Sequence, residues 1–160
     1  MSIKVGDKLP EATFMEMTAD GPQPRTTDEV FGGKTVALFA VPGAYTPTCS
    51  ARHLPGYVDK SADLKGKGVD EIVCTSVNDV FVMGAWGKDA GAGETVRMLA
   101  DGNGAFAQAL GLELDATGFG MGKRSQRYSM IVKDGTVAEL NVEDGGEFKV
   151  SSADYMLNQL

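Results

Sequence analysis

Thr35-Val-Ala-Leu-Phe-Ala-Val41 is the stretch of sequence that decides the fold. A continuous apolar run of this kind suits a strand that is buried on both faces, as in a parallel sheet. A Pro42-Gly43 break ends the run, a helix is expected from about Thr46, and a second buried run follows at 71–77. The order strand, helix, strand predicts a βαβ unit.

The segments on either side extend this unit. Further helices are expected at 79–88, at 105–110 and from Ser151 or Ser152 onward, and further strands at 13–17, 96–99, 128–132 and 137–141. A turn-rich stretch at 19–25 leads to a hairpin partner or a short helix at 27–31. Asp134-Gly135 signals a hairpin, and Ser151 with Asp154 resembles a capping box. A βαβ half followed by a ββα half predicts an α/β, thioredoxin-like fold, with a central mixed β-sheet flanked by helices.

Composition excludes several classes of protein. The net charge is −7, and an acidic domain repels phosphate backbones, so no nucleic-acid partner is expected. No apolar run approaches the roughly 18–20 residues of a membrane helix, and the N-terminus lacks the apolar core of a signal peptide. We therefore expect one domain over residues 1–160, cytoplasmic and without membrane contact.

The chain has two cysteines, Cys49 and Cys74, and one histidine, His53. Two cysteines in such a domain do not indicate a structural disulfide framework, and there is no Cys-x-x-Cys motif. These residues are too few for a convincing zinc or iron site, so no metal and no cofactor are expected.

Cys49 has the setting of an activated thiol. It follows the end of a buried strand, where open α/β sheets place their sites. Thr46 is a good N-cap and Pro47 fits the first helical position, which puts Cys49 in the first turn. Its N–H there has no partner within the helix, and a nearby cation would make the thiol more acidic still. A lone cysteine is more often a small buried hydrophobe, but Pro42, Gly43, Thr46 and Pro47 form a shaped, hydroxyl-bearing loop around this one.

The remaining cysteine and the histidine, Cys74 and His53, are interpreted as structural or supporting residues. Cys74 lies in an apolar strand and should be buried and unreactive. His53 shares a helix face with Cys49 and would act as a base or, the reading we favour, as a helix-surface or supporting histidine that orients the loop by a hydrogen bond. Pro55 should kink or end this helix.

A thiolate that attacks a peroxide also needs positioned donors for the leaving oxygen, and arginine is well suited to this. Candidates lie in the segment 123–128. Lys123 and Arg124 are interpreted as a solvated basic turn. Arg127 begins a predicted strand that would place it near Cys49.

The pattern Pro42-x-x-x-Thr46-x-x-Cys49 resembles the active-site motif of the peroxiredoxins, and the segment 42–57 is similar to their peroxiredoxin-5 (type II) subfamily. The likeness runs from Val5-Gly-Asp-Lys-Leu-Pro10 to the last helix and includes residues 127–129 and 141–143. It implies a thiol-dependent peroxidase that reduces hydrogen peroxide and organic hydroperoxides, with a thioredoxin-like fold and no metal. It also implies a homodimer that meets near the active-site loops.

The resemblance implies a role for each motif residue. Cys49 would be the peroxidatic cysteine and would be oxidised to a sulfenic acid. Thr46 would hydrogen-bond the thiolate or the peroxide, and Arg127 would stabilise the thiolate and the peroxide oxygens. Pro42, with Gly43, would line the substrate site and wall the thiol off from water.

The sequence departs from some relatives in the step of the catalytic cycle that reduces the oxidised Cys49. Some relatives carry a resolving cysteine near the last helix, whereas residues 146–152 contain none here. The spacing from Cys49 to Cys74 matches two-cysteine type II members, so Cys74 is a candidate resolving cysteine, although the helix would have to unwind first. We favour reduction by an external thiol, either glutathione with glutaredoxin or thioredoxin. The alternatives are a redox-sensing or chaperone-like module and a Cys-His acyl-transfer hydrolase using Cys49 and His53.

Overall fold

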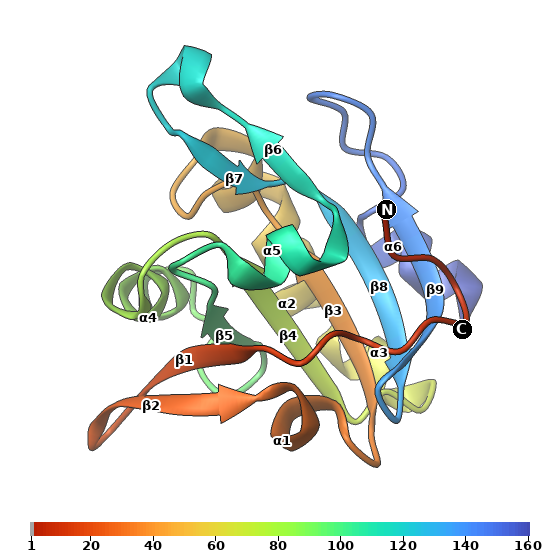
Figure 1. Cartoon of the computed structure of the whole chain (residues 1–160). Coiled ribbons are helices and arrows are strands. Elements are labelled where there is room, and N and C mark those ends of the chain that lie inside the picture. The colour runs from red at the N-terminus through yellow and green to blue at the C-terminus, as the bar shows by residue number, and fades with distance from the viewer. Residues whose placement is uncertain (1) are drawn as a thin grey trace.

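The apolar run at 35–41 forms β3 (Thr35–Ala40), next to the middle of a seven-stranded sheet (Figure 1). The computed structural model of the chain describes residues 2–160, so the first residue of the expected 1–160 domain lies outside the description. β3 pairs in parallel with β4 (Glu71–Ser76), and β4 pairs in parallel with β5 (Arg97–Ala100). The strand order is β2-β1-β5-β4-β3-β8-β9.

Antiparallel hairpins form both edges of this sheet. β8 (Tyr128–Lys133) and β9 (Thr136–Val142) are joined through Asp134-Gly135, and both turn residues have a positive φ, as a tight hairpin turn requires. At the other edge β1 (Thr13–Thr18) pairs with β2 (Gly21–Thr26). The stretch expected as turns at 19–25 is therefore largely a strand, and the helix alternative for the next residues is confirmed by α1 (Thr27–Phe31).

Helices cover both faces of the sheet. In β3, Ala37 and Phe39 point into one apolar cluster, while Val36 and Leu38 point into the other. The first cluster is covered by α2 (Leu54–Asp59), α3 (Ser61–Gly66), α4 (Val80–Asp89) and α6 (Ala153–Gln159). The second is covered by α1 and α5 (Ala105–Leu110). The predicted central mixed sheet flanked by helices is confirmed.

Two local expectations are wrong: the basic turn at Lys123 and Arg124, and the helix cap at Ser151. Lys123 and Arg124 belong to a short strand, β7 (Lys123–Ser125), which pairs with β6 (Glu113–Asp115), and a 3₁₀ turn, η2 (Thr117–Phe119), lies between the two strands. Charged three-residue strands carry no apolar alternation by which a sequence could reveal them. The last helix is capped by Ser152, whose side chain accepts from the N–H of Tyr155. Ser151 has a different partner, described below.

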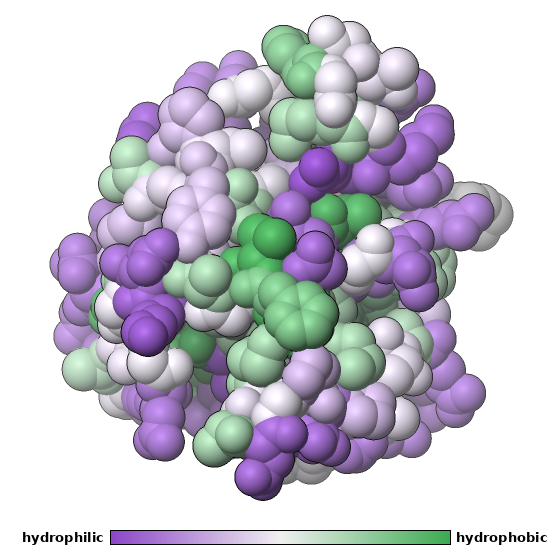
Figure 2. Space-filling view, turned by 90° about the vertical axis from the view of Figure 1, so that its left-hand side faces the viewer, coloured by the Kyte–Doolittle hydropathy of each residue, from purple (hydrophilic) through white to green (hydrophobic). Residues whose placement is uncertain are grey.

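The side of the molecule that carries α4 has an apolar centre surrounded by hydrophilic side chains (Figure 2). Three aromatic side chains are the most solvent-exposed: Tyr45 by 49%, Phe81 by 65% and Phe119 by 87%. They come from the loop after β3, from α4 and from η2. Among the residues described, no helix is both long and apolar enough to span a bilayer.

Candidate active site

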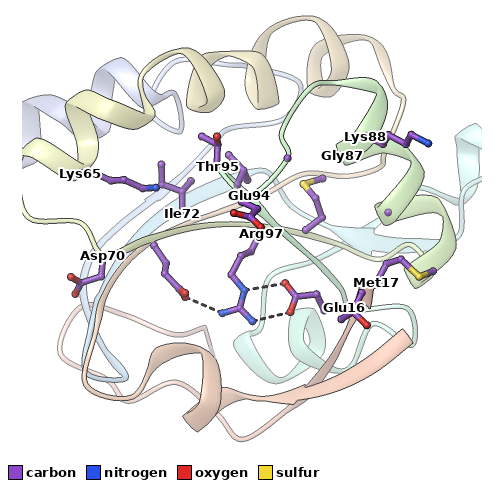
Figure 3. A pocket seen from close by; sticks show the side chains of 16 residues that line it. Glu16, Met17, Lys65, Asp70, Ile72, Gly87, Lys88, Glu94, Thr95 and Arg97 are labelled. Atoms are coloured by element: carbon purple, nitrogen blue, oxygen red, sulfur yellow. Dashed lines mark hydrogen bonds and ion pairs between the residues drawn. The ribbon is translucent and has the colours of Figure 1, made fainter. Parts of the chain in front are cut away.

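A cavity of about 680 Å³ opens at the end of the sheet where β4 and β5 begin (Figure 3). Three of its charged side chains, those of Arg97, Glu16 and Glu71, are paired with one another. The guanidinium of Arg97 donates twice to Glu16, at 3.0 Å each, and once to Glu71, at 2.9 Å. Because β3, β4 and β5 are parallel, the cysteine that follows the end of β3 lies at the opposite end of these strands. The cavity is therefore separate from the predicted site.

The helix that carries Cys49 begins as predicted. Pro47 is its first residue, and the N–H of Ser50 donates to the carbonyl of Thr46 at 2.9 Å. Cys49 is thus at the third helical position, and its side chain is fully buried in this structure. The hydroxyl of Thr46 donates to the carbonyl of Gly43 at 2.7 Å, and among the described residues no N–H of the first helical turn donates to its oxygen, so it does not cap the helix. The oxygen of that hydroxyl remains free to accept a hydrogen bond.

The helix widens where Cys49 sits. Residues Cys49–His53 form a π-helix, η1, in which the N–H of Leu54 donates to the carbonyl of Cys49. Single π-helical turns of this kind are frequent at functional sites. Pro55 does not end the helix, which continues through α2 to Asp59. The widened turn lies just before the proline, where the missing N–H interrupts the regular hydrogen-bond ladder.

Arg127 reaches the sulfur of Cys49. It stands directly before β8, whose first residue, Tyr128, pairs with Ala40 at the end of β3. The strand pairing therefore brings Arg127 beside the loop that follows β3. Its Nη2 donates to Sγ of Cys49 at 3.0 Å. A cationic donor at this distance stabilises the sulfur as a thiolate, which is the nucleophilic form.

The same guanidinium binds His53. Nη1 of Arg127 lies 2.8 Å from Nδ1 of His53, and Nε2 of the ring lies 2.9 Å from the carbonyl oxygen of Ser151. Arginine can only donate and a carbonyl can only accept, so the neutral ring must carry its proton on Nε2. Burial, and then the charge of Arg127, lower the pKa of His53 to about 3.

The expected helix-surface position of His53 is therefore wrong, because the ring is fully buried. Its one bare nitrogen faces Arg127 and not the sulfur of Cys49. This arrangement disfavours a Cys-His hydrolase, in which the ring nitrogen must accept the proton of the nucleophile. A supporting histidine that orients its neighbours by hydrogen bonds agrees with the contacts.

A loop between β9 and α6 covers these side chains. The ring of Phe148 lies 4.9 Å from the ring of His53, centroid to centroid, and the guanidinium of Arg127 lies 5.9 Å from its centroid. The guanidinium of Arg52, an exposed residue, lies over the same ring at 4.8 Å from its centroid. Apolar cover of this kind excludes water and strengthens the electrostatic interactions beneath it. Nothing in the local sequence around Phe148 predicts this contact.

The loop after β3 is held from two sides. The N–H of Ala44 donates to the side chain of Asn78 at 2.9 Å. Arg124 donates to the carbonyls of Val77 and Met121, at 3.1 and 2.8 Å, and a Cβ placed on Gly43 would lie 3.4 Å from its guanidinium. Arg124 is thus partly buried beside the loop, and its interpretation as a solvated turn is wrong. Its position depends on the β6–β7 pairing, which the sequence did not reveal.

Three further predicted residues have the following positions. Pro42 is half-buried and Gly43 is buried in the loop beside Cys49. Lys123 is exposed, as expected, but lies in β7, and it pairs with Asp115 at 3.5 Å. Among residues 2–160, no group of three or more His, Cys, Asp or Glu side chains is arranged to hold a metal ion.

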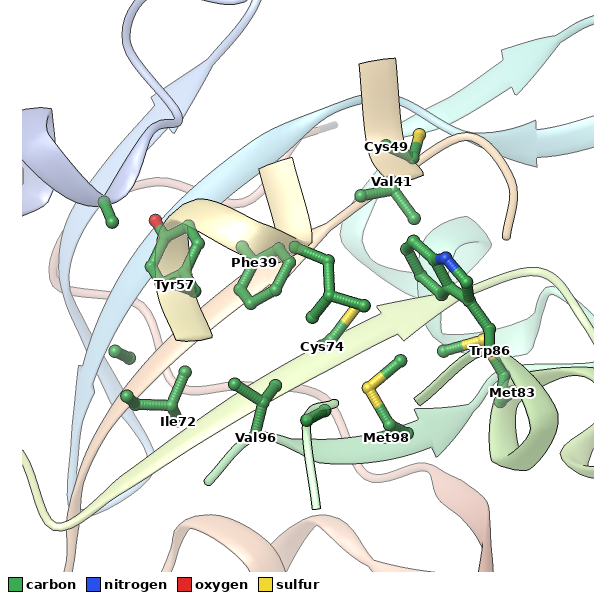
Figure 4. Packing of buried hydrophobic residues seen from close by; sticks show 14 of the residues in the cluster. Phe39, Val41, Cys49, Tyr57, Ile72, Cys74, Met83, Trp86, Val96 and Met98 are labelled. Carbon is green, nitrogen blue, oxygen red and sulfur yellow. The ribbon is translucent and has the colours of Figure 1, made fainter. Parts of the chain in front are cut away.

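Cys74 belongs to the apolar cluster beneath the site (Figure 4). It lies on β4, while Cys49 lies on the helix beside Val41, with its sulfur turned away from Cys74. Burial, and then the proximity of Cys49, raise the pKa of the Cys74 thiol well above its ordinary value. Cys74 therefore stays protonated and is a poor nucleophile in this conformation.

A buried cysteine at a helix start, bound by an arginine on a mixed sheet of thioredoxin type, defines a class of thiol-dependent redox enzymes. The redoxin family model matches residues 4–157 of the chain. Peroxiredoxin-2B of Arabidopsis thaliana is 49% identical over 159 residues, covering 99% of this chain and 98% of the relative. Peroxiredoxin-2E of the same plant, a chloroplastic protein, is also 49% identical and covers 99% and 70%.

Solved structures give the same result. The structure of reduced Prx3 from Vibrio vulnificus in complex with hydrogen peroxide matches with a TM-score of 0.95 and 52% identity, covering 98% of each chain. The chain belongs to the redoxin family and, within it, to the peroxiredoxins, which are thiol-dependent peroxidases. The predicted thioredoxin-like fold and the predicted peroxidase activity are both confirmed.

Proposed function

We propose that Cys49 is the residue that attacks the peroxide. The observation that carries the proposal is the 3.0 Å contact between Nη2 of Arg127 and Sγ of Cys49. The thiolate attacks one peroxide oxygen as the O–O bond breaks, and the sulfur keeps that oxygen as a sulfenic acid. The other oxygen leaves with the bonding electrons and takes a proton from solvent, which yields water from hydrogen peroxide or an alcohol from an organic hydroperoxide.

Two neighbouring groups would hold the peroxide in line for this attack. The hydroxyl proton of Thr46 is bound to the carbonyl of Gly43, so its oxygen would accept from the O–H of the peroxide. Arg127 would donate to the oxygens on which negative charge develops. Pro42 and Gly43 would form the wall of this substrate site. The peroxide bound to the related Vibrio vulnificus protein supports hydrogen peroxide as a substrate.

The test is a stopped-flow reaction of the reduced protein with a slight excess of hydrogen peroxide, in wild type and in Cys49→Ser. Trp86 is a suitable probe, because its indole N–H donates to the hydroxyl of Ser50, next to Cys49, at 3.0 Å. We expect a fast fluorescence change and the gain of one oxygen by mass in the wild type alone. Oxidation no faster than that of a free thiol would refute the proposal.

The sulfenic acid would then be reduced by an external thiol, either glutathione with glutaredoxin or thioredoxin. The burial and the raised pKa of Cys74 support this one-cysteine cycle. The first thiol would form a mixed disulfide with Cys49 and release water, and a second thiol would release Cys49. The chain would act in the cytoplasm, where such reductants keep thiols reduced.

Replacing Cys74 with serine is expected to leave peroxidase turnover within about twofold of wild type with these reductants, because the cycle would use only Cys49. The measurement is steady-state turnover with each reductant. Cys74→Ala is the matched control, since it leaves no hydroxyl in the apolar cluster. If both variants lose turnover with every reductant but keep the first oxidation step, Cys74 is the resolving cysteine.

We also propose that the protein is a homodimer. The support comes from two observations: Tyr45, Phe81 and Phe119 are exposed aromatic side chains, and the side of the molecule in Figure 2 has an apolar centre. Exposed aromatic side chains and exposed apolar patches are typical of protein interfaces. Tyr45 belongs to the loop that precedes Cys49, so a dimer formed through this side would meet near the active-site loops.

A further inference from the structure

Glu143 is a buried carboxylate that the proposed reaction does not use. It follows β9 directly and is only 5% exposed. One of its oxygens, Oε2, accepts three hydrogen bonds: from the N–H of Lys149 at 2.7 Å, and from the N–H and the hydroxyl of Ser151 at 2.8 and 2.6 Å. Three donors on one buried charged oxygen fix the loop 144–151 firmly, since charge-assisted hydrogen bonds are the strong ones.

The fixed loop presents one carbonyl to the active site. The carbonyl oxygen of Ser151 lies 2.9 Å from Nε2 of His53 and accepts from the hydroxyl of Tyr57 at 2.9 Å. From His53 the contacts continue to Arg127 at 2.8 Å and from Arg127 to Cys49 at 3.0 Å. A continuous series of hydrogen bonds thus joins Glu143 to the reactive sulfur.

The Ser151 carbonyl decides which nitrogen of His53 carries the proton. With that acceptor in place, Nε2 holds the proton and Nδ1 is free to accept from Arg127. Without it, only Arg127 favours this tautomer, and the Nε2–H group is left without its acceptor. A proton on Nδ1 would face the N–H groups of Arg127, donor against donor, and would displace the guanidinium from the sulfur.

We propose that Glu143 is a positioning residue for the Cys49 site, acting through the Ser151 carbonyl and His53 on Arg127. Its effect on peroxide reduction rests on the proposed role of Cys49. Its effect on the His53 tautomer does not, and this allows the two proposals to fail separately.

The chain has a single histidine, so ¹⁵N NMR of the labelled imidazole reports on His53 alone. In the wild type we expect only the Nε2–H tautomer between pH 5 and 8. In Glu143→Ala we expect signals of both tautomers, and a rate constant with hydrogen peroxide lower by about tenfold or more, because a small misplacement of a catalytic group is costly. Glu143→Gln keeps the size and one acceptor, so an intermediate loss, about two- to fivefold, is expected.

Glu147→Ala is the matched control. It removes a carboxylate from the same loop, one that is half exposed and pairs only with Lys149, at 3.3 Å. Its His53 signals and rate constant should equal those of the wild type. Circular dichroism and thermal melting verify that each variant folds.

The proposal is overturned if folded Glu143→Ala and Glu143→Gln both keep the wild-type His53 signals and the wild-type rate constant. Should Glu143→Ala not fold, Glu143→Gln decides by the same two measurements. If the wild type itself reacts slowly with peroxide, the role of Cys49 fails, while the tautomer measurement still decides the role of Glu143.

Discussion

Arg127→Lys is expected to slow the reaction of Cys49 with hydrogen peroxide by about 10²–10³-fold, roughly 2.7–4 kcal/mol of transition-state stabilisation. The arginine fork places one nitrogen on Sγ of Cys49 at 3.0 Å and another on Nδ1 of His53 at 2.8 Å. Lysine offers a single nitrogen on a flexible stem and cannot hold both contacts in this geometry. The charge would remain, but its position relative to the breaking O–O bond would be lost.

The measurement is the second-order rate constant from stopped-flow fluorescence, with melting curves to verify the fold. Arg52→Lys is the matched control, because Arg52 is exposed and lies over the same Phe148 ring, and among the described residues it makes no hydrogen bond to Cys49 or His53. Its rate constant should change by no more than about twofold. A rate constant for Arg127→Lys within threefold of wild type would show that charge alone, without the fork, is sufficient.

The parts of the site that the sequence predicted depend on short-range signals. The run at 35–41, the loop that follows it and Pro47 together place Cys49 in the first helical turn, because strand burial and the fit of proline to the first helical position are decided within a few residues. Arg127 was predicted because it comes at the start of a predicted strand. In the structure that strand, β8, begins beside the end of β3 and so brings Arg127 to the loop that follows. The predicted βαβ and hairpin units have the same local origin.

The parts that escaped prediction depend on contacts between distant segments. The acceptor for His53 is a backbone carbonyl 98 residues away. Every residue has a backbone carbonyl, so the sequence does not indicate which of them will accept. Ser151 resembled a helix cap, but its hydroxyl is bound to Glu143 instead. Arg124 looked solvated because the strand pairing that buries it is short and charged. Local propensity cannot reveal such partners, since tertiary packing decides them.

Acid should destabilise the fold through His53 before the carboxylates titrate. The pKa of this imidazole is lowered from 6.5 to about 3 in the folded protein, by burial and then by Arg127. Between these two values the unfolded chain binds a proton that the folded chain does not, so stability rises with pH across this window. Each pH unit inside the window changes the free energy of unfolding by about 1.4 kcal/mol.

From pH 7 to pH 5 the free energy of unfolding is therefore expected to fall by about 2 kcal/mol, which is roughly a thirtyfold change in the folding equilibrium constant. Urea denaturation at several pH values measures it. His53→Gln has no ionisable ring and should show almost no slope over this range, although its stability at pH 7 is expected to be lower. If wild type and variant lose stability equally on acidification, the folded protein protonates His53 as readily as the unfolded chain does. The ring would then not be the neutral acceptor on which the position of Arg127 depends.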